Sequence, residues 1–248
     1  MKTHISRKTS LSTRLAASLL LVSLTAAPCY AGLKEGLAAY GKEDYATAVK
    51  ELTPLAQKGD AKAQTTLGKI YGLGQGVPKD SRASAEWFLK AAEQGVAEAQ
   101  SVLGYLYLVG DGAPQSNSKA LDWMTKAANQ GDVMAQYNLG VMYGGKGVKE
   151  EPAKAAQWMH KAAEQGHKYA LSSLAFMYQE GKGVAKDPVL AHMLYGLSGK
   201  EGNLAALNSQ KTLAAKMSQV QVKEANELAK NWKKGTVLPA KSKSGAKK

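Results

Sequence analysis

Apolar residues recur at helical spacing in adjacent segments of the chain. Residues 61–71 carry an apolar stripe at positions i, i+4, i+7 and i+8, formed by Ala63, Leu67, Ile70 and Tyr71. Residues 82–94 carry a second apolar stripe, formed by Ala83, Trp87, Leu89 and Ala91. The pattern predicts two helices, here called A and B, joined by a short connection.

This helix pair returns along the chain at intervals of 35 or 36 residues. Tryptophan marks the B helix in three copies, at Trp87, Trp123 and Trp158. The A helices share Ala-Gln, Leu-Gly and Tyr positions, as in Ala99-Gln100, Leu103-Gly104 and Tyr107. A fourth copy departs from the pattern, because Leu194 stands at the tryptophan position and no glutamine precedes Gly202. The period predicts four repeats, at 59–94, 95–130, 131–165 and 166–202.

The glycine-rich stretch 72–80 has the composition of a phosphate-binding loop. Its Gly74-Gln-Gly76 core returns in the later copies as Gly110-Asp-Gly112, Gly145-Lys-Gly147 and Gly181-Lys-Gly183. A phosphate loop occurs once per site and follows a strand, whereas each of these stretches lies between two predicted helices. Glycine reaches the positive φ that a chain needs where a helix ends and reverses. We therefore interpret the stretch as a turn, with Asp80, Asn117 and Asp187 at the start of the next helix.

The residues of the repeat resemble the Sel-one-like repeat (SLR), a relative of the tetratricopeptide repeat. The pattern A-Q-x-x-L-G-x-x-Y, G-x-G-V and A-x-x-W-x-x-K-A-A-x-Q-G is present in 99–131 and 131–166, with Ala113 in place of the valine in the first. A single pair cannot bury its apolar face, so stacked copies should form an all-α, right-handed solenoid with one core. We expect the tryptophans to fill the space between neighbouring pairs. The resemblance covers about 59–202 and implies this fold, but it says little about activity.

The two ends of the repeat array have the pattern of capping helices. Residues 32–58 read as a tetratricopeptide-like helix hairpin, and 203–232 as two further helices. In the second of these, Ser218 with Gln221 forms a capping box. Residues 233–248 combine lysine with Gly, Ser, Ala and Pro and are predicted to be a disordered basic tail.

The N-terminal 31 residues have the three parts of a secretory signal peptide. A basic segment is followed by an apolar run from Leu15 to Ala27, and then by small residues at the cleavage site after Ala31. A lipid anchor on Cys29 is the alternative, although Pro28 disfavours it. Cys29 is the single cysteine, so cleavage leaves a chain without disulfides, thiol catalysis or cysteine-ligated zinc. The sequence thus predicts a periplasmic or secreted protein, of the exported bacterial SLR type.

Positive charge is concentrated at the ends of the chain. The formal net charge is +13, of which four charges lie in residues 1–31 and six in 233–248, leaving +3 on residues 32–232. The predicted scaffold is therefore nearly balanced, and no nucleic-acid partner is expected. The tail is either a solvated end or a weak contact with an anionic envelope surface.

Catalytic and metal-binding patterns in the chain are weak. Ser116-x-x-Lys119 matches a β-lactamase-type S-x-x-K motif, but the companion motifs are missing and the residues stand at a helix start. His160 and His167 flank one turn without further convergent ligands. We expect no enzyme activity, no cofactor and no metal.

The remaining hypothesis is a binding scaffold, a monomer that holds a protein or peptide on the concave face of the solenoid. In tetratricopeptide-like solenoids the A helices line that face, which by resemblance assigns the binding surface to Lys62, Lys69, Tyr105, Met134, Tyr137, Val141, Tyr169 and Phe176. The series changes from charged to aromatic along the chain, and an exposed apolar patch usually marks an interaction site. Two alternatives are an envelope hydrolase acting on β-lactams or peptidoglycan, and an anionic-polymer binder that uses the basic tail.

Export has a direct test in the N-terminus of the protein recovered from cells. N-terminal sequencing should give a chain that begins at Gly32, in the periplasm or the medium. A cytoplasmic chain beginning at Met1 would overturn the prediction. A start at a lipidated Cys29 would establish the anchored form instead.

Overall fold

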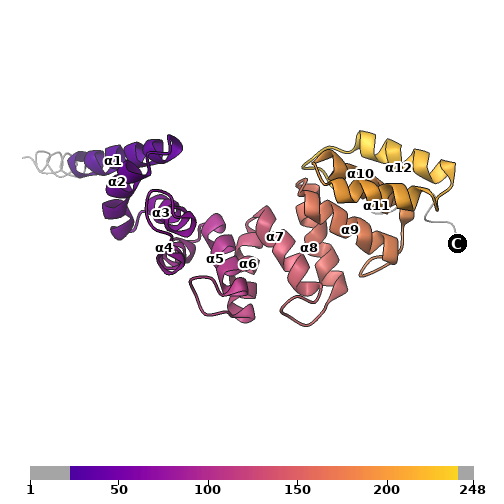
Figure 1. Cartoon of the computed structure of the whole chain (residues 1–248), viewed down its shortest axis with the longest axis horizontal. Coiled ribbons are helices and arrows are strands. Elements are labelled where there is room, and N and C mark those ends of the chain that lie inside the picture. The colour runs from indigo at the N-terminus through magenta and orange to yellow at the C-terminus, as the bar shows by residue number, and fades with distance from the viewer. Residues whose placement is uncertain (1–22, 240–248) are drawn as a thin grey trace, which may run out of the picture. The chain divides into compact units, whose positions relative to one another are not determined.

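The computed structural model describes residues 23–239, which form twelve helices and no strand (Figure 1). This confirms the prediction of an all-α helical repeat solenoid. The helices are α1 (Ser23–Gly41), α2 (Tyr45–Gln57), α3 (Ala61–Leu73), α4 (Ser81–Glu93), α5 (Ala97–Val109), α6 (Asn117–Asn129), α7 (Val133–Tyr143), α8 (Pro152–Glu164), α9 (Lys168–Glu180), α10 (Pro188–Lys200), α11 (Leu204–Ala214) and α12 (Gln219–Asn231).

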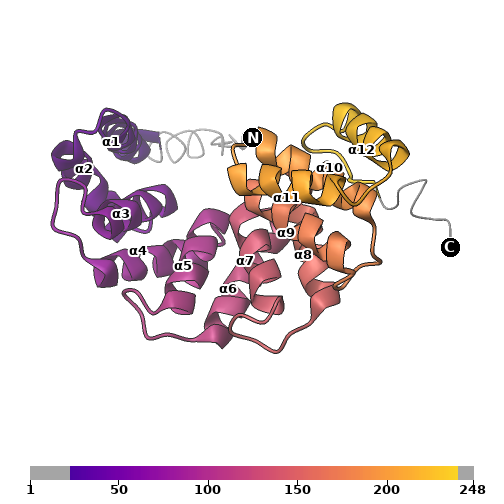
Figure 2. The ribbon, with the colours of Figure 1, turned by 45° about the vertical axis from the view of Figure 1, so that its right-hand side comes forward.

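The chain divides into two compact units, one ending at Lys90 and the other beginning at Ala91. The core of the first unit is built from α1, α2 and α3 around Leu52, Leu67 and Ile70, all fully buried. In the second unit the helices α5 to α9 follow one another in chain order (Figure 2). The largest core cluster in this unit joins α8, α9 and α10 with residues of α11 and α12.

The glycine-rich stretches are turns, as the sequence indicates. Both glycines of each stretch have positive φ, which in the fourth copy is 74° at Gly181 and at Gly183. A side chain on Gly183 would also collide with the carbonyl oxygen of Pro152. Each turn is closed by a backbone hydrogen bond to the tyrosine carbonyl of the A helix, with N···O distances between 2.8 and 2.9 Å; the donors are Asp80, Ser116, Glu151 and Asp187.

In the first three repeats, the A helix packs closely on its B helix at the glycine of the Leu-Gly pair. A Cβ added at Gly104 would lie 2.7 Å from Met124 Cγ, and one at Gly140 would lie 2.8 Å from Met159 Cγ. In the first repeat, Gly68 meets the ring of Phe88 in the same way. The side chain that fills this space is the residue directly after each tryptophan, and it is buried in all three copies.

The tryptophans meet the expectation only in part. Trp87 packs against the core of α1, α2 and α3, and Trp158 packs against the core around Met124 and Leu139. Trp87, Trp123 and Trp158 are only partly buried. A lysine three residues later lies over each ring, with Nζ at 4.3, 3.9 and 4.2 Å from the ring centroid. Consecutive residues of a helix point about 100° apart, so the side chain after the tryptophan faces the glycine of the A helix, and the tryptophan points to a different side of the B helix.

In the first three repeats, a buried glutamine connects the A helix to the end of the helix before it. Its side-chain Nε2 donates to a backbone carbonyl eight residues earlier, at 2.9 Å from Gln64 to Ala56, 3.0 Å from Gln100 to Ala92 and 3.2 Å from Gln136 to Ala128. In the second unit, the glutamine of the following Gln-Gly pair completes the contact. Gln130 donates to Gln100 Oε1 at 2.8 Å, and Gln165 donates to Gln136 Oε1 at the same distance.

The fourth repeat replaces this glutamine contact with a different set of hydrogen bonds. Leu171 stands at the glutamine position and is fully buried. Ser198 Oγ donates to the carbonyl of Lys168 at 2.7 Å, and Asn203 Nδ2 donates to Ser172 Oγ at 3.1 Å. The predicted capping box on α12 is present, with both the Ser218 and Gln221 hydrogen bonds formed.

The first residues of the predicted basic tail contact α8. Gly235 N–H donates to the backbone carbonyl of Glu164 at 2.7 Å, and Leu238 N–H donates to the Glu164 carboxylate at 3.1 Å. Leu238 is buried, so the segment 233–239 lies on the end of α8. Composition did not reveal this contact because a single apolar residue anchors the segment.

Residues 1–22 and 240–248, which hold most of the predicted signal peptide and tail, lie outside the described residues. Helix α1 begins at Ser23 and includes the predicted cleavage site. No helix within residues 23–239 is both long and apolar enough to cross a membrane.

The buried position after the tryptophan has a testable energetic consequence. Met124→Ala should lower the free energy of unfolding by about 2–5 kcal/mol, because it empties a fully buried site against Gly104. Trp123→Ala should cost less, because that ring is partly solvated. Urea unfolding of the two variants measures the difference. A larger loss for Trp123→Ala would show that the tryptophan, after all, is the main packing residue.

Candidate functional site

The predicted binding residues fall into two groups that belong to different units. Lys62 and Lys69 lie on α3 of the first unit, where Lys62 is exposed and Lys69 is partly buried. The other six lie on α5, α7 and α9 of the second unit: Tyr105, Met134, Tyr137, Val141, Tyr169 and Phe176. Within the second unit, Tyr137 lies beside Tyr169, and Tyr137, Val141 and Phe176 line one cavity.

Within the second group, four large apolar side chains are about half exposed. Phe176 retains 50% of its accessible surface, and Tyr105, Met134 and Tyr169 have closely similar values. Tyr137 and Val141 are partly buried and pack against the core of the second unit. Half exposure on successive A helices supports an interaction surface over a purely structural role.

Three rings form a cluster between α7 and α9. The Tyr137 ring lies 4.5 Å from the His167 ring and 6.4 Å from the Tyr169 ring, measured between centroids. Burial raises the pKa of the Tyr137 hydroxyl, with a smaller contribution from Tyr169. Tyr137 is thus a partly buried ring that contacts both His167 and Tyr169.

A cavity of about 570 Å³ opens next to this cluster; we call it the α7–α9 cavity. Tyr137, Val141 and Phe176 line it together with apolar residues of α8 such as Met159. Polar groups at its wall include Ser172, Ser209 and Asn203. Its volume and its mostly apolar lining with a few polar groups are typical of ligand and peptide sites.

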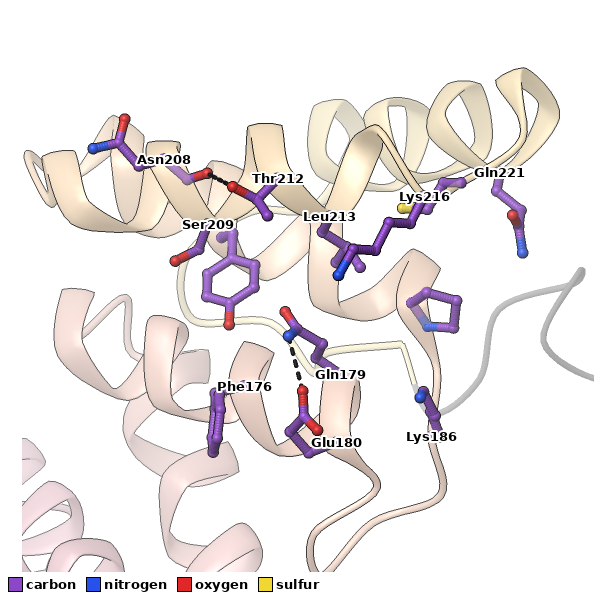
Figure 3. Close-up of a pocket in the computed structure, with 13 residues that line it drawn as sticks. Phe176, Gln179, Glu180, Lys186, Asn208, Ser209, Thr212, Leu213, Lys216 and Gln221 are labelled. Atoms are coloured by element: carbon purple, nitrogen blue, oxygen red, sulfur yellow. Dashed lines mark hydrogen bonds between the residues drawn. The ribbon is translucent and has the colours of Figure 1, made fainter.

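A second cavity, of about 650 Å³, lies between α9 and α11; we call it the α9–α11 cavity. Figure 3 shows Phe176, Gln179 and Glu180 on one wall and Asn208, Ser209 and Thr212 on the facing helix. The two cavities share three lining residues, Phe176, Tyr195 and Ser209. They therefore adjoin at Phe176.

Tyr195, Asn203 and Ser209 were missed as site residues by sequence reasoning. Tyr195 is buried, and burial raises the pKa of its hydroxyl, with Glu180 adding to the effect and a hydrogen bond to Ser209 opposing it. The repeat pattern gave no signal for these residues, because Asn203 and Ser209 lie beyond the last Gly of the array. The only hint was the loss of tryptophan at Leu194, where α10 becomes buried on all sides.

The three described histidines have structural roles. His167 is the N-cap of α9, where its Nδ1 accepts from the backbone N–H of Ala170 at 3.2 Å. His160 Nε2 lies 2.9 Å from the Tyr178 hydroxyl, and His192 Nδ1 lies 3.4 Å from Gln210 Nε2. No group of three His, Cys, Asp or Glu residues that could hold a metal is found among the described residues.

The S-x-x-K motif is likewise engaged in local structure. Ser116 Oγ is the N-cap acceptor of α6, bound by the backbone N–H of Lys119 at 3.3 Å. The Lys119 amine lies 5.1 Å from the centroid of the Tyr107 ring. Ser116, one residue before the predicted Asn117, is thus the residue that starts the helix.

A fold of paired helices with one recurring turn defines the class of helical repeat proteins. Within this class the chain belongs to the Sel1 repeat family, which matches at residues 61–96, 97–132, 133–167 and 168–203. Proteins of this family often mediate protein–protein interaction. None of the proteins with curated descriptions matches the sequence.

Two solved structures resemble the chain over most of its length. One is a protective antigen of uropathogenic Escherichia coli with an SLR fold, at 34% identity and a TM-score of 0.72 over 82% of this chain and 45% of the antigen. The chain thus spans less than half of that protein. The other is a Sel1 repeat protein from Oxalobacter formigenes, at 30% identity and a TM-score of 0.67 over 77% of this chain and 83% of the relative.

The histidines predict an acid-sensitive fold. Burial lowers the pKa of His160, His167 and His192 from the usual 6.5; Glu164 opposes this at His160, while Lys168 adds to it at His167. Because the folded state favours the neutral rings, their contribution to stability is complete above about pH 6.5 and is lost as the pH falls below that value through the folded-state pKa. The melting temperature should therefore drop between pH 7.5 and pH 5.

His167→Asn tests this assignment, since asparagine keeps an N-cap acceptor without titrating. The variant should melt with a smaller difference between pH 7.5 and pH 5 than the wild type. Asp132→Asn, at the corresponding cap of α7, is the matched control and should leave the difference unchanged in this range. Equal pH dependence in wild type and His167→Asn would mean that His167 does not contribute.

Proposed function

We propose that the chain is an exported, non-catalytic adaptor that binds a protein or peptide partner along α7, α9 and α11. The observation that carries this proposal is the position of Phe176. Its half-exposed ring lies at the junction of two cavities. Aromatic side chains at such junctions are typical anchors of protein interfaces.

The neighbouring residues support the same role. Tyr169 and Tyr137 extend the apolar surface from Phe176 toward the N-cap of α9. The hydroxyl groups of Ser172 and Ser209 lie at the cavity wall and donate to backbone carbonyls, so their remaining lone pairs can accept from the backbone amides of a bound chain. The surface thus combines apolar anchors with a few hydrogen-bonding groups.

Export is part of the proposal and rests on the sequence of residues 1–31. The envelope hydrolase and the anionic-polymer binder stay alternative predictions. Against the hydrolase, the one motif considered for it supplies a helix cap and a lysine stacked on tyrosine. The polymer binder depends on lysines of the tail, most of which lie outside the described residues.

Site-specific photo-cross-linking tests the proposed surface without a known ligand. A photoreactive phenylalanine analogue in place of Phe176, in the bacterium that produces the protein, should give a discrete cross-linked species in the envelope fraction. The same analogue at Val220, an exposed apolar residue of α12 that lines neither cavity, is the matched control and should give none. Mass spectrometry of the species should identify a protein or peptide.

The cross-linked species formed at position 176 should be lost when Tyr169→Ala is added, because Tyr169 belongs to the same proposed surface. Tyr169→Ala should leave the melting temperature nearly unchanged, because the ring is half exposed. Cross-linking that is equal at positions 176 and 220, or absent at both, would overturn the proposed site.

A further inference from the structure

Lysines dominate the charge around the two adjoining cavities. Lys146 and Lys182 line the α7–α9 cavity, which has no carboxylate among its lining residues. Lys186 and Lys216 line the α9–α11 cavity, where Glu180 is the single acidic lining residue. Four cations therefore face one anion along the combined surface, in contrast with the near balance of residues 32–232 as a whole.

These lysines keep most of their charge available. The Lys182 amine pairs with Glu150 at 2.5 Å, so its charge is partly compensated. Lys146, Lys186 and Lys216 are exposed, and none of them forms an ion pair with another described residue. Glu180 accepts a hydrogen bond from Gln179 at 2.9 Å, and it lies near the buried hydroxyl of Tyr195.

The position of two lysines follows from the repeat. Lys146 and Lys182 are the middle residues of the third and fourth Gly-x-Gly turns, where the first two turns carry Gln75 and Asp111. Since the turns connect A and B helices at the same end of each pair, the cationic residues of successive repeats meet at one rim of the α7–α9 cavity. Both lysines therefore occupy the same variable position of the repeat, in its third and fourth copies.

The chain's own basic tail does not suit this surface. Residues 240–248 carry four lysines and no acidic residue, so the surface would repel them. An occupant that complements it must bring apolar side chains for the region of Phe176 and negative charge on both sides. This reasoning rests on the proposed function and narrows its partner.

We propose that the two cavities bind one extended peptide segment with an apolar or aromatic centre and acidic residues flanking it. The centre packs on Phe176, Val141 and Tyr137. The flanking carboxylates face Lys146 on one side, and Lys186 and Lys216 on the other. Electrostatic attraction of this kind raises the association rate and selects against basic partners.

Selection from a random 12-residue peptide library tests the charge preference and the site separately. The library is displayed on phage and selected on the chain 32–248 and, in parallel, on its Phe176→Ala variant. Peptides that the wild type enriches and the variant does not are those that use the cavities. We expect them to carry an excess of Asp and Glu over the unselected library.

Binding of the most enriched peptide, measured by fluorescence anisotropy, then tests the lysines. Lys146→Glu combined with Lys216→Glu should weaken it about 10-fold or more at 50 mM salt, and less at 500 mM salt. The matched control is Lys200→Glu combined with Lys211→Glu, which makes the same change in net charge at exposed positions outside both cavities. The control should change binding by less than about 3-fold, on the scale of a long-range charge effect.

The outcomes separate this inference from the function on which it rests. Phe176-dependent peptides without an acidic excess, or equal effects of the two charge-reversal pairs, would overturn the acidic partner and leave the binding surface in place. If no peptide depends on Phe176, the surface itself is wrong and the inference falls with it.

Discussion

One buried glutamine side chain in each of α3, α5 and α7 connects that A helix to the end of the helix before it. Its amide donates to the last turn of the preceding helix, and in the second unit its oxygen accepts from a glutamine about 30 residues later. Both ends of a buried amide are thereby satisfied, which is the condition for placing it in a core without loss of stability. A glycine one helical turn after the glutamine lets the A helix approach its B helix, and Met124 or Met159 of the B helix fills the space between them. Within the second unit, these contacts connect α5 and α7 to the ends of the helices that precede and follow them.

The hydrogen bonds between neighbouring helices change at the fourth repeat, where the buried glutamine is absent. At the fourth repeat, Leu171 replaces the glutamine, and a serine–asparagine set connects α9 to α10 and α11. Helices α11 and α12 pack against α10, which is buried from Val189 to Ser198. They also leave Phe176 between two cavities rather than beneath a further repeat. The proposed binding surface is therefore a consequence of how the array is capped.

The proposed site also shows how a structural repeat can carry specificity. Positions that the repeat needs, such as the turn glycines and the buried glutamines, are occupied in nearly every copy. Positions beside them are free to vary, and in the third and fourth copies they hold aromatic residues on the A helix and lysine in the turn. Variation at fixed sites on a rigid array is the means by which solenoids alter their partners without altering their fold.

The amino-acid sequence by itself determined the helices, their pairing and the turns, because periodicity and positive-φ glycines are local properties. The S-x-x-K motif could likewise be recognised as a helix-start position, since capping depends on a few adjacent residues, whereas the N-cap role of His167 was found only in the structure. Other features needed the tertiary structure. Whether Trp123 or Met124 fills the core depends on the rotation of one helix against another, and the anchoring of 233–239 on Glu164 joins residues about 70 positions apart. The lysines that line the two cavities and the residues that α11 contributes to them are also brought together by tertiary contacts. No local pattern in the sequence indicates that these segments lie next to each other.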